Sequence, residues 1–282
     1  MSFALPRGPE SPRVSVILPT YDRAGLLDRS IRSVLSQTYS DLELIIVDDA
    51  SRDDTERIVM RIGDPRIVYC RTDQNRGPAA ARNVGIDRAR GEFLAFQDSD
   101  DEWLPPKLER HLDIFSRAGT DAMVTYSDMF RIDRSGDSKL HRSPEIAPER
   151  LIHPDTGFYQ VYGLGIIATV MRRSTFDHGL RFDERFRCFE DLDLFIRMAS
   201  RGRFHHIREP LVRYYENEGV STDLRNHLRA RRLLVRLYRA ELIRHHPRFF
   251  MKEALRVQAG FLNLALGIGR THRPRACRGR AG

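Results

Sequence analysis

The chain contains 282 residues, of which 41% are hydrophobic and 30% are charged. These proportions are typical of globular proteins and exclude a wholly disordered chain, and the length suffices for one large domain, with or without a helical extension. The formal net charge of +8 is unevenly distributed. Residues 224–282 contain 15 Arg and Lys but two Glu, a net of +13, so residues 1–223 hold 32 basic and 37 acidic residues, a net of −5.

The first residues of the chain contain prolines and charges where a secretory signal needs an apolar run. We therefore interpret residues 1–12 as a loose leader and expect a cytoplasmic protein. The three cysteines are odd in number and far apart, which argues against a disulfide framework and against a zinc site. The longest uncharged stretch of a predicted helix, residues 257–269, is too short to span a bilayer.

Short apolar runs alternate with helical patterns through the first third of the chain. The expected strands are residues 14–18, 42–47, 66–70 and 92–96, and helices are expected around 26–35, 55–62 and 78–89. This alternation predicts an α/β fold with a doubly wound, mainly parallel sheet. In such sheets ligands bind outside the carboxyl ends of the strands, where this sequence has the polar clusters 19–22, 48–49 and 98–101.

The second half of the chain is less regular. We expect a helix at 105–117, strands at 122–126, 164–172 and 211–215, a long surface loop at 134–157, a helix at 192–199, and two basic helices at 224–246 and 247–269. The expected domain is 13–222, made of two halves at 13–127 and 128–222. A basic helical extension at 223–270 and a basic tail at 271–282 follow.

Three acidic or basic features stand where the predicted fold places a site. Asp98 and Asp100 lie two positions apart just after a buried strand, and their oxygens are ligands suited to Mg²⁺ or Mn²⁺, although an acidic loop alone is more often a solvated turn. Arg82 lies one turn into a predicted helix. The free N-terminal amides of that helix suit an anion, although an ordinary capped helix explains the same sequence equally well. Glu190 and Asp191 begin a further helix, a position that the helix dipole alone also favours.

Several ordered motifs together resemble the family 2 inverting glycosyltransferases, which have the GT-A fold. The matching segments are VSVILPTYDRAG, LELIIVDDASRDDT, NRGPAAARNVGIDRARGEFLAFQDSDD and FEDLDLFIRMA. Processive members of that family carry a QxxRW motif and transmembrane helices, whereas the only tryptophan here is Trp103. The resemblance therefore implies an enzyme that adds a single sugar.

The resemblance implies that 13–127 is a nucleotide-sugar-binding half and 128–222 an acceptor-side half, and it also assigns roles to individual residues. Those expected at the nucleotide-sugar donor are Pro19, Tyr21 and Asp49 around the base, usually uracil, with Arg82 and Asp98 near the phosphates. Asp98 and Asp100 match the DxD motif, with Asp100 as the direct metal ligand. Asp191 matches the catalytic base, which leaves Glu190 to orient the acceptor or to cap the helix. Relatives often place a His or Arg after the final strand, where this chain has Glu216-Asn217.

The implied reaction is in-line displacement at the anomeric carbon with inversion of configuration, assisted by a divalent metal. The donor is expected to be UDP-linked and the acceptor a glycan or glycolipid of the cell surface. Two alternatives stay open: a sugar nucleotidyltransferase, although the expected glycine-rich loop with a lysine is absent after the first strand, and a non-catalytic nucleotide-sugar-binding protein. The basic residues 223–282 suit an anionic membrane at the inner face of the cell, an oligomer contact or packing on the domain, and nucleic acid is disfavoured.

Overall fold

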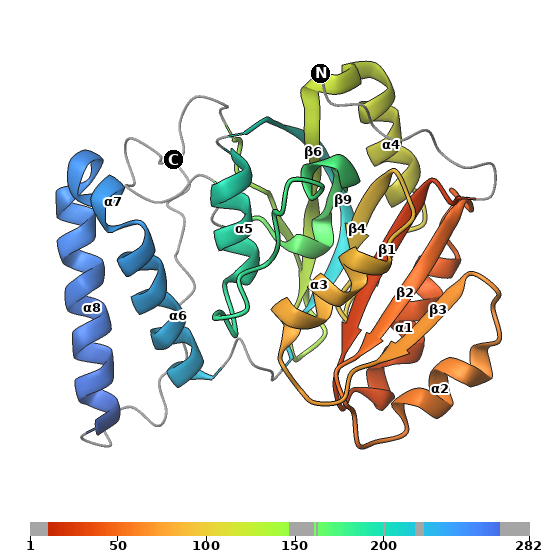
Figure 1. Ribbon diagram of the computed structural model, residues 1–282, viewed down its shortest axis with the longest axis horizontal. Helices are drawn as coiled ribbons and strands as arrows, with labels where there is room; N and C mark the ends of the chain where they lie inside the picture. The colour runs from red at the N-terminus through yellow and green to blue at the C-terminus, as the bar shows by residue number, and fades with distance from the viewer. Residues whose placement is uncertain (1–10, 147–160, 162, 200, 218–222, 266–282) are drawn as a thin grey trace. The chain divides into compact units, whose positions relative to one another are not determined.

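The computed structural model describes residues 11–146, 161, 163–199, 201–217 and 223–265 (Figure 1). The chain divides into two compact units, Met1–Val220 and Ser221–Gly282, which are treated separately below. Most of the expected leader, residues 147–157 of the expected long loop, the end of the second basic helix and the basic tail at 271–282 lie outside the described residues.

The first unit is built on a sheet that has nine strands within the described residues. They are β1 (Val14–Thr20), β2 (Leu42–Asp48), β3 (Ile67–Arg71), β4 (Phe93–Phe96), β5 (Glu102–Trp103), β6 (Ala122–Ile132), β7 (Ser138–His141), β8 (Thr169–Arg172) and β9 (Arg203–Tyr215). The order is β3-β2-β1-β4-β8-β6-β9-β5, with β7 beside β6. The strands β1 to β4 pair in parallel, as do β6 and β9, whereas β8 runs antiparallel to both of its neighbours.

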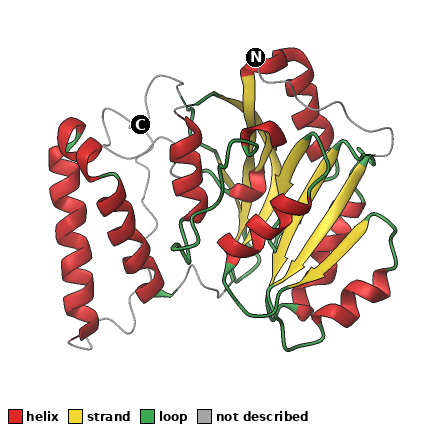
Figure 2. Ribbon diagram, in the orientation of Figure 1, coloured by secondary structure: helices red, strands yellow, loops and turns green. Residues whose placement is uncertain are grey.

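Helices cover both faces of this sheet, which confirms the predicted α/β architecture (Figures 1 and 2). They are α1 (Ala24–Leu35), α2 (Thr55–Ile62), α3 (Pro78–Arg88), α4 (Lys107–Ala118) and α5 (Glu190–Ala199). Every residue of β1 and β2 is buried, as expected for strands covered by helices on both faces. In α1 the buried Leu27, Ile31 and Val34 recur at the spacing of one helical face.

Small residues bring α3 close to the sheet. Ala79, Ala80 and Ala81 are buried, and a Cβ atom added at Gly85 would overlap the side chain of Ile17 on β1. A larger residue at position 85 would push the helix away from the strand. This close packing fixes where α3 presents Arg82, one turn into the helix.

The structure departs from the sequence-based expectations mainly in the second half. The expected strand 211–215 is only the end of β9, which begins at Arg203, and the pairing of β6 with β9 shifts register near Pro210. The expected strand 164–172 is a 3₁₀ turn (Ile166–Ala168) followed by the short β8. The short strand β7 lies within the expected surface loop.

The second unit contains α6 (Leu224–Leu237), α7 (Arg239–His245) and α8 (Pro247–Ala265) within its described residues. One helix was expected from 224 to 246, but Tyr238 separates α6 from α7. Leu228 packs where Gly260 leaves room on α8, and Arg231 forms an ion pair with Glu253 at 2.7 Å. None of the helices in the described part of the chain is long and apolar enough to cross a bilayer.

Candidate active site

The loops that follow β1 and β2 are joined by hydrogen bonds. The backbone N–H of Asp22 donates to Oγ of Ser51 at 3.0 Å, and the N–H of Arg52 donates to Oδ1 of Asp22 at 2.7 Å. The N–H of Ala24 donates to a carboxylate oxygen of Asp53 at 2.9 Å. Two of the polar clusters expected at the carboxyl ends of the strands therefore form one continuous surface.

The three residues expected at the nucleotide base differ in their surroundings. Pro19 is buried within β1, whereas Tyr21 lies just beyond the strand and is 39% exposed. Asp49 is buried, and its oxygens accept from the backbone N–H groups of Arg76 at 3.0 Å and Gly77 at 2.6 Å. Asp49 thus holds the start of α3 against the end of β2, and its contact with a base stays a prediction.

Helix α1 fixes the backbone of the acidic loop after β4. Oγ of Ser30 donates to the carbonyl oxygen of Asp98 at 2.8 Å, and Nη2 of Arg29 donates to the carbonyl oxygen of Asp100 at 2.5 Å. The guanidinium of Arg29 also stacks 3.7 Å from the ring centroid of Tyr215 on β9. These contacts hold the loop so that its carboxylates stay close to one another.

Negative charge accumulates in this acidic loop. Burial, and then the charge of Asp98, raise the pKa of the Asp100 carboxyl above its usual range. Burial and the charges of Asp98 and Asp100 raise the pKa of Asp101 further. Oδ1 of Asp101 accepts from the N–H of Tyr215 at 2.8 Å, but its buried Oδ2 has no hydrogen-bond partner within the described structure. A cation beside these carboxylates would relieve the repulsion between them.

A buried arginine connects the acidic loop to the start of α5. Arg82 donates to Oδ1 of Asp98 at 2.7 Å and to Oε1 of Glu190 at 2.5 Å. Burial disfavours the charged guanidinium, but the two carboxylates outweigh that effect and raise the pKa of Arg82. The structure brings Arg82, Asp98 and Glu190 together, and both terminal nitrogens of Arg82 have carboxylate partners, so the expected contact of Arg82 with the phosphates stays a prediction.

Asp191 stands beside this cluster with a different environment. It begins α5 next to Glu190, is partly exposed, and accepts a hydrogen bond from the N–H of Leu192 at 2.8 Å. Burial, together with the charge of Glu190, raises the pKa of Asp191 to about 7 against the opposing effect of Arg82. The preceding Phe189 has φ of +64°, a conformation that costs energy for a residue other than glycine. Asp191 can therefore take up and release a proton near neutral pH.

Sequence reasoning missed two residues of the site. Asn217, considered only for the His or Arg that it replaces, has its side-chain amide nitrogen 3.4 Å from Oδ2 of Asp100. Arg29, which holds the acidic loop, lies within the predicted helix around 26–35, and nothing in the helical pattern distinguishes it from the other polar residues of that helix.

The acidic loop by itself offers too few ligands to enclose a divalent cation. Among the described residues, no three His, Cys, Asp or Glu side chains are grouped so that they could hold a metal. A cation at Asp98 and Asp100 would therefore need further oxygen ligands from a bound molecule or from water. The buried Oδ2 of Asp101, which has no hydrogen-bond partner within the described structure, is an oxygen of the kind that such an ion accepts as a ligand.

Solved structures share the fold at low sequence identity. S. aureus TarS in complex with UDP-GlcNAc matches with a TM-score of 0.63 and 22% identity, over 92% of this chain and 74% of that one. The mannosyltransferase PcManGT from Pyrobaculum calidifontis, in complex with GDP-Man and Mn²⁺, matches with a TM-score of 0.57 and 21% identity over 93% of this chain and 77% of that one. At this identity the likeness shows that the first unit has the GT-A fold.

Curated relatives are more similar in sequence. The succinoglycan biosynthesis protein ExoO of Rhizobium meliloti is 34% identical over 214 residues, which cover 70% of this chain and 62% of the relative. The putative colanic acid biosynthesis glycosyl transferase WcaA of Escherichia coli is 32% identical over 196 residues, 67% of each chain. The chain thus spans about two thirds or less of the length of these relatives.

The family model for glycosyl transferase family 2 matches residues 15–180. The match contains the loops after β1, β2 and β4 as well as α3 with Arg82, and it ends shortly before Glu190. Because it covers more than half of the 282 residues, the chain belongs to glycosyl transferase family 2.

Proposed function

We propose that this family 2 glycosyltransferase is non-processive and inverting, and that it transfers one sugar from a UDP-linked donor to a hydroxyl of a glycan or glycolipid acceptor. The observation that carries the proposal is the position of Asp191 at the start of α5, next to Glu190 and to the bridge that Arg82 forms between Glu190 and Asp98 of the acidic loop. The TarS complex with UDP-GlcNAc supports a UDP-linked donor. The names of relatives in succinoglycan, colanic acid and teichuronic acid biosynthesis support a role in polysaccharide synthesis.

Asp191 acts as the general base in this reaction. Its carboxylate accepts the proton of the acceptor hydroxyl while that oxygen forms a bond to the anomeric carbon of the donor sugar. The bond from that carbon to the nucleoside diphosphate breaks on the opposite side, so the configuration inverts and the diphosphate leaves with the bonding electrons. A base works best when its pKa lies near the working pH, which a value of about 7 satisfies.

Glu190 has a positioning role because its carboxylate already forms an ion pair with Arg82. Glu190 is buried and its carboxylate is engaged in this ion pair at 2.5 Å, so it is not free to act as the base. Its negative charge raises the pKa of the neighbouring Asp191. Adjacent residues on a helix diverge by about 100°, which lets one carboxylate face Arg82 while the other faces the acceptor.

Asp98 and Asp100 would hold the Mg²⁺ or Mn²⁺ ion that we expect the reaction to use. When bound, such a cation supplies positive charge that stabilises the leaving diphosphate. Ser30 and Arg29 hold the backbone of the acidic loop, and Arg82 neutralises part of the charge of Asp98. These residues keep the carboxylates of the loop in place before the donor binds.

The test is turnover and binding measured on the same variants. Release of the nucleoside diphosphate is followed with a panel of UDP- and GDP-sugars and an oligosaccharide acceptor, and donor binding is measured by calorimetry. We expect Asp191→Asn to lower kcat by about 10² to 10⁴ while donor affinity is retained. Glu190→Gln serves as the comparison, with a smaller loss of kcat, because it removes the partner of Arg82 and the charge beside Asp191 but leaves the base itself in place.

Three results would count against the proposal. If Asp191→Asn keeps normal kcat while Glu190→Gln loses it, the roles of the two carboxylates are exchanged. Release of pyrophosphate from a nucleoside triphosphate and a sugar phosphate identifies a nucleotidyltransferase instead. Donor binding without turnover on any acceptor identifies a binding protein.

A further inference from the structure

Four arginines form a ladder along the first helices of the second unit. Arg229, Arg232 and Arg236 lie on α6 and Arg239 begins α7, and all four side chains are exposed. Spacings of three, four and three residues place them along one side of the helix. None of the four forms an ion pair with a described residue, which leaves their charges available to a ligand.

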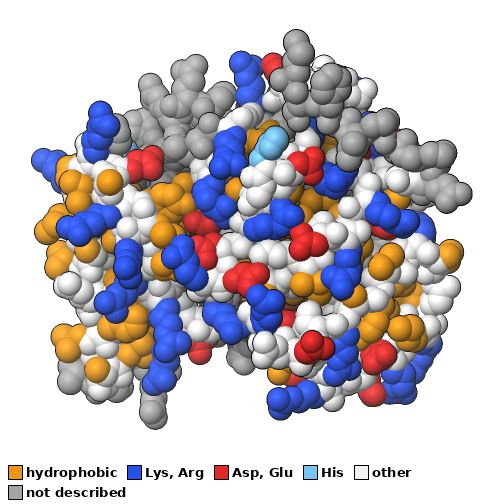
Figure 3. All heavy atoms as spheres, in the orientation of Figure 1, with side chains coloured by type: hydrophobic (Ala, Val, Ile, Leu, Met, Phe, Trp, Pro, Cys, Tyr) orange, Lys and Arg blue, Asp and Glu red, His pale blue; other side chains and the backbone are white. Residues whose placement is uncertain are grey.

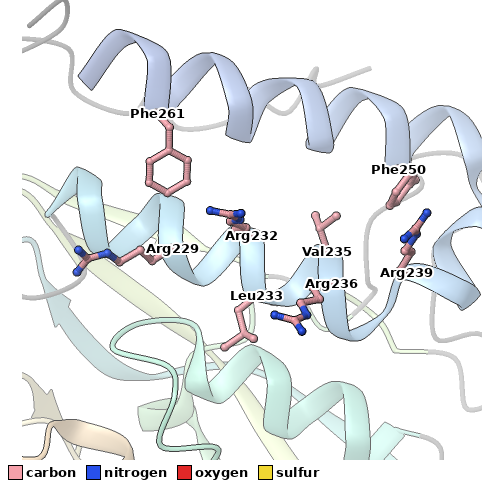
Figure 4. Close-up of a pocket in the computed structure, with 8 residues that line it drawn as sticks. All are labelled: Arg229, Arg232, Leu233, Val235, Arg236, Arg239, Phe250 and Phe261. Carbon is pink, nitrogen blue, oxygen red and sulfur yellow. The ribbon is translucent and has the colours of Figure 1, made fainter. Parts of the chain in front are cut away.

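Two aromatic side chains of α8 face this arginine ladder (Figure 4). Phe250 and Phe261 line, together with the ladder, a groove of about 690 Å³ between the helices. The guanidinium carbon of Arg232 lies 6.0 Å from the centroid of the Phe261 ring. Leu233 and Val235 of α6 also line the groove, which therefore combines basic and apolar side chains, as suits an amphiphile with an anionic group.

The outer side of α8 exposes an apolar stripe. Met251, Leu255 and Leu262 are 57%, 59% and 58% exposed, and at about 100° per residue they lie within about 40° of one another around the helix. Val257 and Glu253, on the side that packs against α6, are buried. Figure 3 shows basic side chains along α6 and hydrophobic side chains over α8 on the same face of this unit.

We propose that the arginine ladder and the apolar stripe of α8 form a surface by which the protein docks on an anionic phospholipid bilayer. The arginines contact lipid phosphates, and Met251, Leu255 and Leu262 enter the boundary between headgroups and acyl chains. Charge complementarity argues for this occupant, because each of the four guanidinium groups, which have no ion-pair partner among the described residues, is a donor for phosphate oxygens. The docking surface is independent of the transfer chemistry and rests on contacts within the second unit alone.

Two other occupants explain the surface less well. Nucleic acid would use the arginines, but it gives three large aliphatic side chains on α8 no partner. A second copy of the chain would cover the apolar stripe, but a symmetric contact through this face brings two arginine ladders together, and like charges oppose that association. A lipid surface alone uses both features.

The experiment measures co-sedimentation of the full chain with vesicles of phosphatidylcholine, with and without phosphatidylglycerol. The ladder variant is Arg232→Gln with Arg236→Gln, and the stripe variant is Leu255→Gln with Leu262→Gln. The control is Arg61→Gln with Arg88→Gln, which removes the same charge from exposed positions of the first unit. All six positions are outside the proposed active site, so release of nucleoside diphosphate with a soluble acceptor should be unchanged in each variant.

We expect binding only to vesicles that contain phosphatidylglycerol, weakening as salt is added. The partition coefficient between vesicles and solution is expected to fall about fivefold for each arginine removed, so about 30-fold for the ladder variant. The control variant should bind like the original chain. The stripe variant should lose at least about tenfold. Equal losses in the ladder and control variants, or full binding by the stripe variant, overturn the proposal. If the chain binds a DNA duplex more tightly than it binds vesicles, and the stripe variant keeps that binding, the surface binds nucleic acid instead.

Discussion

Arg82→Met is the change that probes the site most sharply. Methionine keeps a flexible apolar stem but removes the charge that faces Asp98 and Glu190. The Arg82 side chain is 5% exposed, and that of Glu190 is 9% exposed, so this ion pair is buried. Removing one partner of a buried pair costs about 3–5 kcal/mol, because it leaves the other charge without compensation. Asp98 is 31% exposed, so water partly replaces its lost partner and the cost should lie at the low end of that range.

The same variant should also change the chemistry of Asp191. The charge of Arg82 lowers the pKa of Asp191, so without it that pKa rises above about 7. A base with a higher pKa is protonated over a wider range, and the pH at which kcat/KM reaches its plateau should therefore increase. A role of Arg82 in packing alone predicts no such change in the pH profile.

Urea unfolding and the pH dependence of kcat/KM together test this reasoning. The control is the double variant Arg82→Met with Glu190→Gln, which removes both members of the buried pair. We expect it to be more stable than Arg82→Met alone, with a coupling of about 1–3 kcal/mol. A loss below about 1 kcal/mol for Arg82→Met, with no gain on adding Glu190→Gln, would refute the assignment of Arg82 as the residue that neutralises Glu190.

Three further predictions follow from the site. The original enzyme should lose kcat/KM as the pH falls through about 7, where Asp191 is protonated, and Asp191→Asn should abolish this dependence along with most activity. Mn²⁺ with UDP should raise Tm more above neutral pH than in acid, because protons compete for the carboxyl of Asp100, whose pKa is raised, and Asp100→Ala should remove the shift. Gly77→Ala should cost about 1–3 kcal/mol in urea unfolding, since Gly77 has φ of +93° and an added Cβ atom would lie 2.5 Å from Nη1 of Arg187.

The parallel half of the sheet could be predicted because its strands are continuous apolar runs. A strand that helices cover on both faces needs no alternation, and residues 14–18 and 42–47 have none. Helices at the predicted positions follow from the same logic, since their apolar residues recur at one face. The position of the site at the carboxyl ends of these strands then follows from the topology.

The strand β9 could be predicted only in part because its sequence looks polar. Residues 203–210 contain two histidines, two arginines, a glutamate and Pro210, which removes a backbone donor from the ladder. The structure accommodates them because His206 stacks on Tyr126 with ring centroids 4.7 Å apart, and its Nε2 donates a hydrogen bond to Oδ1 of Asp128 at 2.7 Å. Such partners lie about 80 residues away, so no local pattern reveals them.

Within the site, the sequence could identify the segments that form it, but not which side chains contact one another. Asp98 and the pair Glu190-Asp191 were recognisable from their motifs, whereas the bridge through Arg82 depends on how closely α3 approaches the sheet. That approach is set by Gly85 against Ile17, a contact that local spacing does not predict. The same packing explains why Arg82, expected near the phosphates, has two carboxylate partners instead of open space.

The bridge through Arg82 gives adjacent carboxylates different chemistry. Alone, Glu190 and Asp191 are equivalent candidates for a base at the start of α5. Arg82 removes that equivalence, because it forms an ion pair with Glu190 directly, while it reaches Asp191 only through space. Burial and the charge of Glu190 raise the pKa of Asp191 to about 7. The arginine thus determines which carboxylate is engaged in a buried ion pair and which one is left to exchange a proton at neutral pH.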